Sequence, residues 1–197
     1  RIQKVLLPDE VSVALEIYAR RRTHYLRICA SSTTSHAFLA SKPARRGTDR
    51  ETPLLLLLRK YVRGGRIVAV RQLPLERVLV LNISSSEERS GGSRSVQLVA
   101  EFIGRQSNVV LVDEAGLILD SMKRVGPSIN RYRTILPKRP YVPPLPLGKP
   151  HPSQVRRSEL EAAAGACGDL SSWKLLIECA GGVSPLVARE ALYRSTG

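Results

Sequence analysis

Two polar segments interrupt the apolar runs of this sequence, and both carry side chains that can bind anions. The first, GRQSN at residues 104–108, separates two runs that predict strands. Gly104 permits a turn with positive φ, and Ser107 and Asn108 can hydrogen bond their own backbone to hold it. Arg105 would then be directed outward from a rigid edge. From the residues alone, an ordinary turn between strands is the simpler interpretation.

The second polar segment, residues 123–141, combines cations with aromatic rings. Two tyrosines stand among six basic residues: Lys123, Arg124, Arg131, Arg133, Lys138 and Arg139. Arginines interleaved with aromatic residues can contact phosphates and stack on bases. The alternative is a solvated basic loop whose tyrosines cover a sheet, and the spacing does not distinguish the two.

Patterns typical of catalytic sites are missing from the sequence. It contains no P-loop, no GxGxxG, no GxSxG and no HExxH. The paired carboxylates Glu87–Glu88 and Asp113–Glu114 fall in predicted turns, where a solvated loop is the simpler interpretation. Ser84, Ser85 and Ser86 fall in a predicted hairpin loop without a nearby base. We therefore expect no catalytic residue and no cofactor.

The charge balance indicates a polyanionic partner. The 197 residues include 31 Lys and Arg against 17 Asp and Glu, a net charge of +14, and 24 of the cations are arginine. A GC-rich genome explains the preference for arginine but not the excess of cations over anions. The excess favours nucleic acid, anionic lipid or acidic protein as partner. No run approaches the roughly 18 apolar residues of a membrane-spanning helix.

The cysteines, Cys29, Cys167 and Cys179, are odd in number and form no CxxC pair. They predict buried free thiols in a reducing compartment, which favours the cytoplasm, rather than disulfides or a zinc site. We therefore expect no metal.

Short β-rich segments fill the first two thirds of the chain. Apolar and β-branched residues alternate or cluster between turn signals, which predicts an antiparallel meander packed as a sandwich or partial barrel. Within it, PLLLLLRKYVRGG begins at Pro53, a favoured first helical position, and ends at Gly64–Gly65. This pattern predicts a helix at about 53–63 that packs its leucines on the sheet.

Proline enrichment separates this region from a helical one. We predict a β-sandwich domain over 1–136, a proline-rich linker over 137–152 and a helical module over 153–197. In the module, Ser153 and Asp169 are candidate helix caps. The segment GGVSPLVAREALYRSTG predicts a tight turn into a last helix, with backbone N–H groups suited to phosphate.

Three motifs in order, EFIGRQSN, KRV…INRYRTILP…RPY and GGVSPLVAREAL, resemble the NFACT family, specifically its NFACT-N domain. The resemblance covers essentially the whole chain. It implies an α+β fold: an antiparallel β-sandwich like the amino-terminal domain of formamidopyrimidine-DNA glycosylases, followed by a small helix-two-turns-helix module. Two positions depart from the family pattern, which usually has histidine in place of Gln106 and glycine in place of Lys138.

The resemblance also implies a function. The domain would bind tRNA, including alanyl-tRNA, on the large ribosomal subunit and support C-terminal alanine tailing of stalled nascent chains, as a cytoplasmic, non-enzymatic module without a membrane partner. The family's acidic–arginine pair matches Glu76 and Arg77, which in isolation would be a surface ion pair worth ~0–1 kcal/mol. The other implied contact residues are Arg105, Gln106, Asn108, Lys123, Arg124, Arg131 and Arg133.

Two other classes of function remain open at this point. Some family members are named as fibronectin-binding proteins, so the alternative function is a surface adhesin that adds a fibronectin strand to a sheet edge. A DNA glycosylase rests on fold analogy alone. The proline–glutamate nucleophile and zinc finger of those enzymes are not found in this sequence.

Overall fold

The computed structural model describes residues 1–45, 47, 51–86, 93–145, 148–166, 168 and 170–196. The chain divides into two compact units. The β unit contains Arg1–Leu73 and Arg77–Pro143, and the helical unit contains Pro74–Glu76 and Pro144–Gly197. The predicted domain boundaries at 136 and 152 stay predictions.

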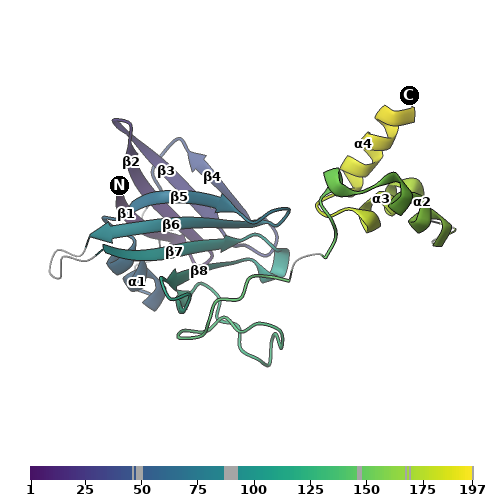
Figure 1. The fold of residues 1–197 in the computed structure, drawn as a ribbon. Coiled ribbons are helices and arrows are strands. Elements are labelled where there is room, and N and C mark those ends of the chain that lie inside the picture. Colours follow the sequence, from purple (N-terminus) through teal and green to yellow (C-terminus); the bar gives the residue numbers. More distant parts are fainter. Residues whose placement is uncertain are drawn as a thin grey trace. The chain divides into compact units, whose positions relative to one another are not determined.

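Two antiparallel sheets make up the β unit (Figure 1). The first has the order β1-β2-β3-β4, with strands Ile2–Asp9, Ser12–Ala19, Arg22–Cys29 and His36–Ala40. The second has the order β5-β6-β7-β8-β9, with strands Arg66–Gln72, Val78–Ser86, Ser93–Glu101, Asn108–Asp113 and Ile118–Ser121. The predicted antiparallel meander and the α+β fold class are confirmed.

One hairpin differs from the prediction. The β6–β7 ladder continues through Ser84↔Ser95, Ser85↔Arg94 and Ser86↔Ser93, so the predicted loop serines lie in a strand. Backbone hydrogen bonds hold such a ladder together, and polar side chains do not prevent them. Residues 87–92, which include Glu87 and Glu88, lie outside the described residues.

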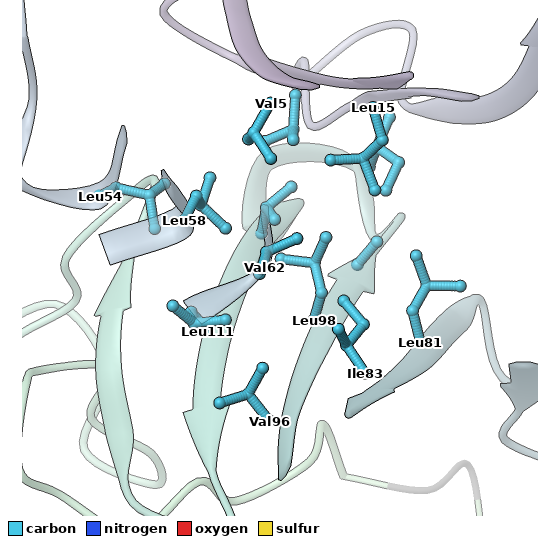
Figure 2. Packing of buried hydrophobic residues seen from close by; sticks show 14 of the residues in the cluster. Val5, Leu15, Leu54, Leu58, Val62, Leu81, Ile83, Val96, Leu98 and Leu111 are labelled. Atoms are coloured by element: carbon cyan, nitrogen blue, oxygen red, sulfur yellow. The ribbon is translucent and has the colours of Figure 1, made fainter. Parts of the chain in front are cut away.

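A hydrophobic core fills the space between the sheets, and helix α1, Pro53–Tyr61, closes one side of it. Thr52 caps the helix by accepting from the Leu55 N–H at 3.2 Å, and Gly64 ends the turn after it with φ +84°. Leu54 and Leu58 are buried in one cluster with residues of both sheets (Figure 2). The helix expected from its proline and glycine boundaries is therefore present, and its leucines pack as predicted.

A second, smaller core lies on the other face of the β5–β9 sheet. Val80, Val99 and Val110 are buried there together with Ile135, which comes from the basic segment 123–141. Strand β8 is consequently buried on both faces, which explains its continuous apolar run. The basic segment therefore covers part of a sheet face with Ile135 and Tyr141, whereas Tyr132, the other tyrosine that one sequence interpretation placed on a sheet, is 53% exposed.

Three α-helices form the described part of the helical unit: α2, Arg157–Ala166; α3, Ser172–Cys179; and α4, Pro185–Thr196. The cap predicted at Ser153 is wrong, because Ser153 lies in the short 3-10 helix Pro152–Gln154 and α2 starts later. At α2 the Glu159 carboxylate accepts from the Arg156 N–H at 2.9 Å. Asp169 lies outside the described residues, and Ser171 precedes α3 as its cap residue.

Within the described part of the chain, no helix combines the length and apolarity needed to cross a membrane.

Candidate nucleic-acid interface

Several predicted contact residues meet at one end of the β5–β9 sheet. Strand pairing sets Val78 opposite Glu101 and Glu101 opposite Asn108, so β6 and β8 begin where β7 ends. Strand β9 ends at the same edge, since Ser121 pairs with Val110. We call this edge the basic rim and define it as Arg77, residues 104–108, and Lys123–Arg124.

The GRQSN segment forms a single 3-10 turn at the rim. Gly104 has φ +52°, and the Gln106 and Ser107 N–H groups donate to the carbonyls of Ile103 and Gly104, each at 3.0 Å. Arg105 and Gln106 are exposed. The glycine therefore shortens the connection between β7 and β8 and leaves the guanidinium of Arg105 facing solvent.

Asn108 fastens this turn to the end of β9. Its Nδ2 donates to the Lys123 carbonyl at 2.7 Å, and its Oδ1 accepts from the N–H groups of Lys123 and Val109, both at 2.9 Å. The residue is 1% exposed, so its side chain positions the rim and is not displayed to solvent. The Ser107 hydroxyl, also expected to hold the turn, has no hydrogen-bond partner among the described residues.

The two cations that follow β9 are both held in place. Lys123 Nζ donates to the carbonyl of Ala30 at 2.8 Å, which ties the rim to the end of β3 in the other sheet. Arg124 makes two contacts with the buried Asp120, Nε to Oδ1 at 3.0 Å and NH2 to Oδ2 at 3.3 Å. The hydrogen bond and charge of Asp120 raise the pKa of Arg124. Half of the Arg124 side chain stays exposed, at 53%.

Arg133 turns into the interior. Its guanidinium donates to Glu101 through NH1 at 3.1 Å and NH2 at 2.5 Å, and the Tyr141 hydroxyl donates to the same carboxylate at 2.7 Å. Glu101 is fully buried and Arg133 is 5% exposed. Burial, followed by the charge of Glu101, raises the pKa of Tyr141. We therefore assign Arg133 to anchoring the 130–141 segment on β7, where its side chain is not open to solvent as a predicted RNA contact would be.

Three arginines of the predicted set stay open to solvent: Arg77, Arg105 and Arg131. Each is exposed, and none has an acidic partner in the described ranges of the chain. Arg131 lies in a turn that Asn130 closes by accepting from the Tyr132 and Arg133 N–H groups at 2.9 and 3.2 Å. Burial thus divides the predicted contact residues into two groups. Some are held by other residues and support the rim, and three arginines are exposed to solvent.

Glu76 is the last residue before a boundary in the chain between the two units. It is half-buried and belongs to the helical unit, whereas its neighbour Arg77 belongs to the β unit. The Arg77 carbonyl accepts from the Phe102 N–H at 2.8 Å, which fixes the backbone of Arg77 beside the GRQSN turn. Glu76 and Arg77 therefore stay the predicted acidic–arginine pair, with the arginine displayed on the rim.

Close packing explains the glycines of the GGVSP turn. A Cβ on Gly182 would lie 2.9 Å from Leu75 Cδ2, and one on Gly181 would lie 3.1 Å from the Lys149 carbonyl oxygen. The Gly181 N–H donates to the Pro150 carbonyl at 2.9 Å, so it is not available to phosphate as the sequence predicted. Ser184 caps α4 by accepting from the Val187 N–H at 3.2 Å.

Sequence reasoning missed two residues that shape the interface, Glu101 and Asp120. Both are buried carboxylates in β-strands, and each holds one arginine of the predicted set. A carboxylate beside the apolar residues of a predicted strand was the available signal, because a buried carboxylate requires a partner.

The described residues contain no group of three or more His, Cys, Asp or Glu side chains that could hold a metal ion. Cys29 and Cys179 are free and half-buried, and Cys167 lies outside the described residues. Asp113 stabilises the turn that follows it, because its Oδ1 accepts a hydrogen bond from the Leu117 N–H at 2.8 Å.

Comparisons with known proteins give a consistent picture. A family model described as NFACT N-terminal and middle domains matches residues 1–196. The protein named Rqc2 homolog RqcH from Bacillus subtilis (strain 168) is 32% identical over 203 residues, which cover 99% of this chain. The chain spans only 34% of the length of that relative.

Two solved structures share the fold. One is the N-terminal domain of the fibronectin-binding protein PavA from Streptococcus pneumoniae, with TM-score 0.84, 27% identity, and coverage of 99% of this chain and 72% of that one. The other is the N-terminal part of the fibronectin/fibrinogen-binding protein from Streptococcus suis, with TM-score 0.84, 30% identity, and coverage of 100% and 72%.

Proposed function

The chain belongs to the NFACT family, and on that premise we propose that it is the RNA-binding module of a cytoplasmic ribosome quality-control factor. The module would bind tRNA, alanyl-tRNA included, on the large ribosomal subunit. In the complete protein this binding would support C-terminal alanine tailing of stalled nascent chains. The proposed role is binding and not catalysis.

The observation that carries the proposal is the pairing of charges around the basic rim. The two buried carboxylates each form an ion pair with one arginine, Asp120 with Arg124 and Glu101 with Arg133. Arg77, Arg105 and Arg131 face solvent without an acidic partner in the ranges that the structure describes. Displayed guanidiniums on a rigid edge suit phosphate, because their planar fork can make two parallel hydrogen bonds to its oxygens.

Each predicted residue has a distinct part in this proposal. Arg77, Arg105 and Arg131 contact phosphates, and the exposed Gln106 supplies a neutral hydrogen-bonding group beside them. Lys123 adds positive charge and ties the rim to Ala30, and Arg124, whose charge Asp120 balances, holds the rim together. Tyr132 is 53% exposed and offers a ring on which an unpaired base can stack. Asn108 and Arg133 support these groups from the interior.

The test measures tRNA binding by fluorescence anisotropy for the wild-type chain and for Glu76→Ala/Arg77→Ala. This double substitution removes one acid and one base, so the net charge of +14 does not change. The matched control is Arg157→Ala/Glu161→Ala, which removes an exposed ion pair of 2.7 Å from α2 and also leaves the net charge unchanged. Loss of binding in the first variant alone supports the proposal. Equal binding by all three proteins contradicts a specific site at Arg77.

A second candidate function is fibronectin binding. It is favoured by the names of the two structural relatives and by the edge strand β5, on which Val68 and Val70 are each 59% exposed. A fibronectin segment could pair with that edge through main-chain hydrogen bonds. Saturable fibronectin binding together with no tRNA binding in the same assay would favour the adhesin.

A further inference from the structure

We propose that the turn between β2 and β3 is a second RNA-phosphate contact, which we call the arginine tip and define as Arg20, Arg21 and Arg22. This inference rests on the proposed function and adds a contact surface to it. The tip lies outside the three motifs on which the family resemblance depends.

The backbone of the tip is strained. Strands β2 and β3 pair without interruption up to Ala19↔Arg22, so the hairpin loop contains only Arg20 and Arg21. Their φ angles are +49° and +61°. Two successive left-handed residues form the turn type for which Asn-Gly is strongly preferred. In other L-residues this conformation brings Cβ too close to the following carbonyl oxygen.

Nothing in the described fold explains why arginines stand here. All three side chains are exposed, and none makes a hydrogen bond or an ion pair with a described residue. Glu16, on the same strand β2, forms an ion pair with Lys4, with 3.3 Å between Glu16 Oε2 and Lys4 Nζ. Asp9 and Glu10 lie at the β1–β2 turn, which is the opposite end of the sheet. Arg20 and Arg21 therefore strain the turn through their backbone, and their guanidiniums do not stabilise the hairpin, which points to a ligand.

Other cations strengthen the positive field at this end of the β unit. Ile2 pairs with Ile17 of β2, and the Ile2 carbonyl accepts from the Gly64 N–H at 2.7 Å. The connection between α1 and β5 consequently lies at the same end as the tip. It carries Arg63, and β5 begins directly after it with Arg66; both arginines are exposed.

The distance between the tip and the basic rim suits RNA as the partner. Strand β3 begins at Arg22, and Ala30, just beyond its end, accepts the hydrogen bond from Lys123 of the rim. Eight residue steps of an extended strand span roughly 26 Å. A folded RNA carries phosphates along such a distance and can contact both ends at once. An acidic peptide of fewer than about eight extended residues would reach one end only.

The experiment compares three variants of the chain in tRNA anisotropy over a salt series, together with their melting temperatures. Arg20→Asn/Arg21→Gly removes two cations and supplies the residues that the turn prefers. Arg20→Lys/Arg21→Lys keeps both charges. Arg156→Ala/Arg157→Ala removes two exposed cations from the helical unit and is the control for net charge.

We expect Arg20→Asn/Arg21→Gly to melt at a higher temperature than the wild type and to bind tRNA more weakly. Loss of two phosphate contacts would lower the slope of log affinity against log salt by roughly 1.4 to 1.8, and the affinity in 0.1 M salt by roughly tenfold or more. The lysine variant should keep the wild-type slope. The helical-unit control should bind like the wild type.

Three results would overturn the inference. The first is a more stable Arg20→Asn/Arg21→Gly variant with unchanged affinity and slope, while Glu76→Ala/Arg77→Ala still abolishes binding; the proposed function would then stand without the tip. The second is an equal loss of affinity in the helical-unit control. The third is unchanged tRNA binding with lost binding to vesicles containing phosphatidylserine, which would make the tip a membrane contact. A wild-type chain that binds no tRNA would instead refute the proposed function itself.

Discussion

Lys138 shows at the scale of one residue how backbone geometry limits the choice of amino acid. Its φ is +65°, in the left-handed region that favours glycine. The conformation is fixed because the Lys138 N–H donates to the Ile118 carbonyl at 2.8 Å and the neighbouring Arg139 carbonyl accepts from Ile118. The NFACT resemblance gives glycine as the usual residue here, and the structure supplies the physical reason.

Replacing Lys138 with glycine should therefore stabilise the chain. Removal of the left-handed penalty gains about 1–2 kcal/mol, and the greater freedom of glycine in the unfolded state costs about 0.5–1 kcal/mol. We expect a net gain of about 0.5–1 kcal/mol in the free energy of unfolding, measured by urea denaturation. Lys138→Ala keeps the strain and is the control. An equal gain in the alanine variant would show that the side chain, and not the backbone, is responsible.

The buried pair of Glu101 and Arg133 gives the second residue-scale prediction. Arg133→Ala should lower the free energy of unfolding by about 3–5 kcal/mol, because it leaves the Glu101 carboxylate buried without its cation. Replacing both residues with apolar ones, Glu101→Leu/Arg133→Met, should cost less than the single change. Urea denaturation of both variants checks this order. A loss below about 1 kcal/mol for Arg133→Ala would mean that the pair is effectively solvated.

At the scale of elements, the sequence was sufficient where local signals agree. Each strand follows from a β-rich run between turn residues, and α1 follows from Pro53 at its start and Gly64 at its end. Ser153 was misassigned because a serine before a helical pattern can cap only if the helix begins directly after it. That start depends on the preceding residues, of which Pro152–Gln154 form a separate 3-10 helix with His151 and Val155 as its cap residues.

The interior positions of the candidate site could not be predicted by local reasoning. Arg131 and Arg133 have the same side chain and stand two residues apart, yet only Arg133 is buried. The difference depends on Glu101, which is 32 residues away in the sequence. Asn108 is similar, because its partner Lys123 comes from the end of another strand. Residue type identified the basic region, whereas the division into supports and displayed cations required the fold.

Capping of α1 gives a prediction at the element scale. Thr52→Ala removes the acceptor for the Leu55 N–H and should lower the free energy of unfolding by about 1 kcal/mol. Thr52→Ser keeps the acceptor oxygen and should stay within about 0.5 kcal/mol of the wild type. Chemical denaturation of both variants provides the measurement. Equal stability of Thr52→Ala and the wild type would show that solvent replaces the cap without loss.

At the scale of the whole molecule, we propose that the exposed part of the +14 charge serves RNA binding at two surfaces. The β unit displays cations at the basic rim and at the arginine tip, and its buried carboxylates neutralise only cations that serve as supports. An RNA that contacts several of these cations displaces its counterions as it binds. Binding should therefore depend steeply on salt concentration.

The most direct test of the central claim is the salt dependence of tRNA affinity for the wild-type chain and for Arg77→Ala/Arg105→Ala/Arg131→Ala. Three lost phosphate contacts should lower the slope of log affinity against log salt by roughly 2.1 to 2.7. A triple variant that keeps the wild-type slope and affinity would contradict tRNA binding at the basic rim and at the turn that carries Arg131.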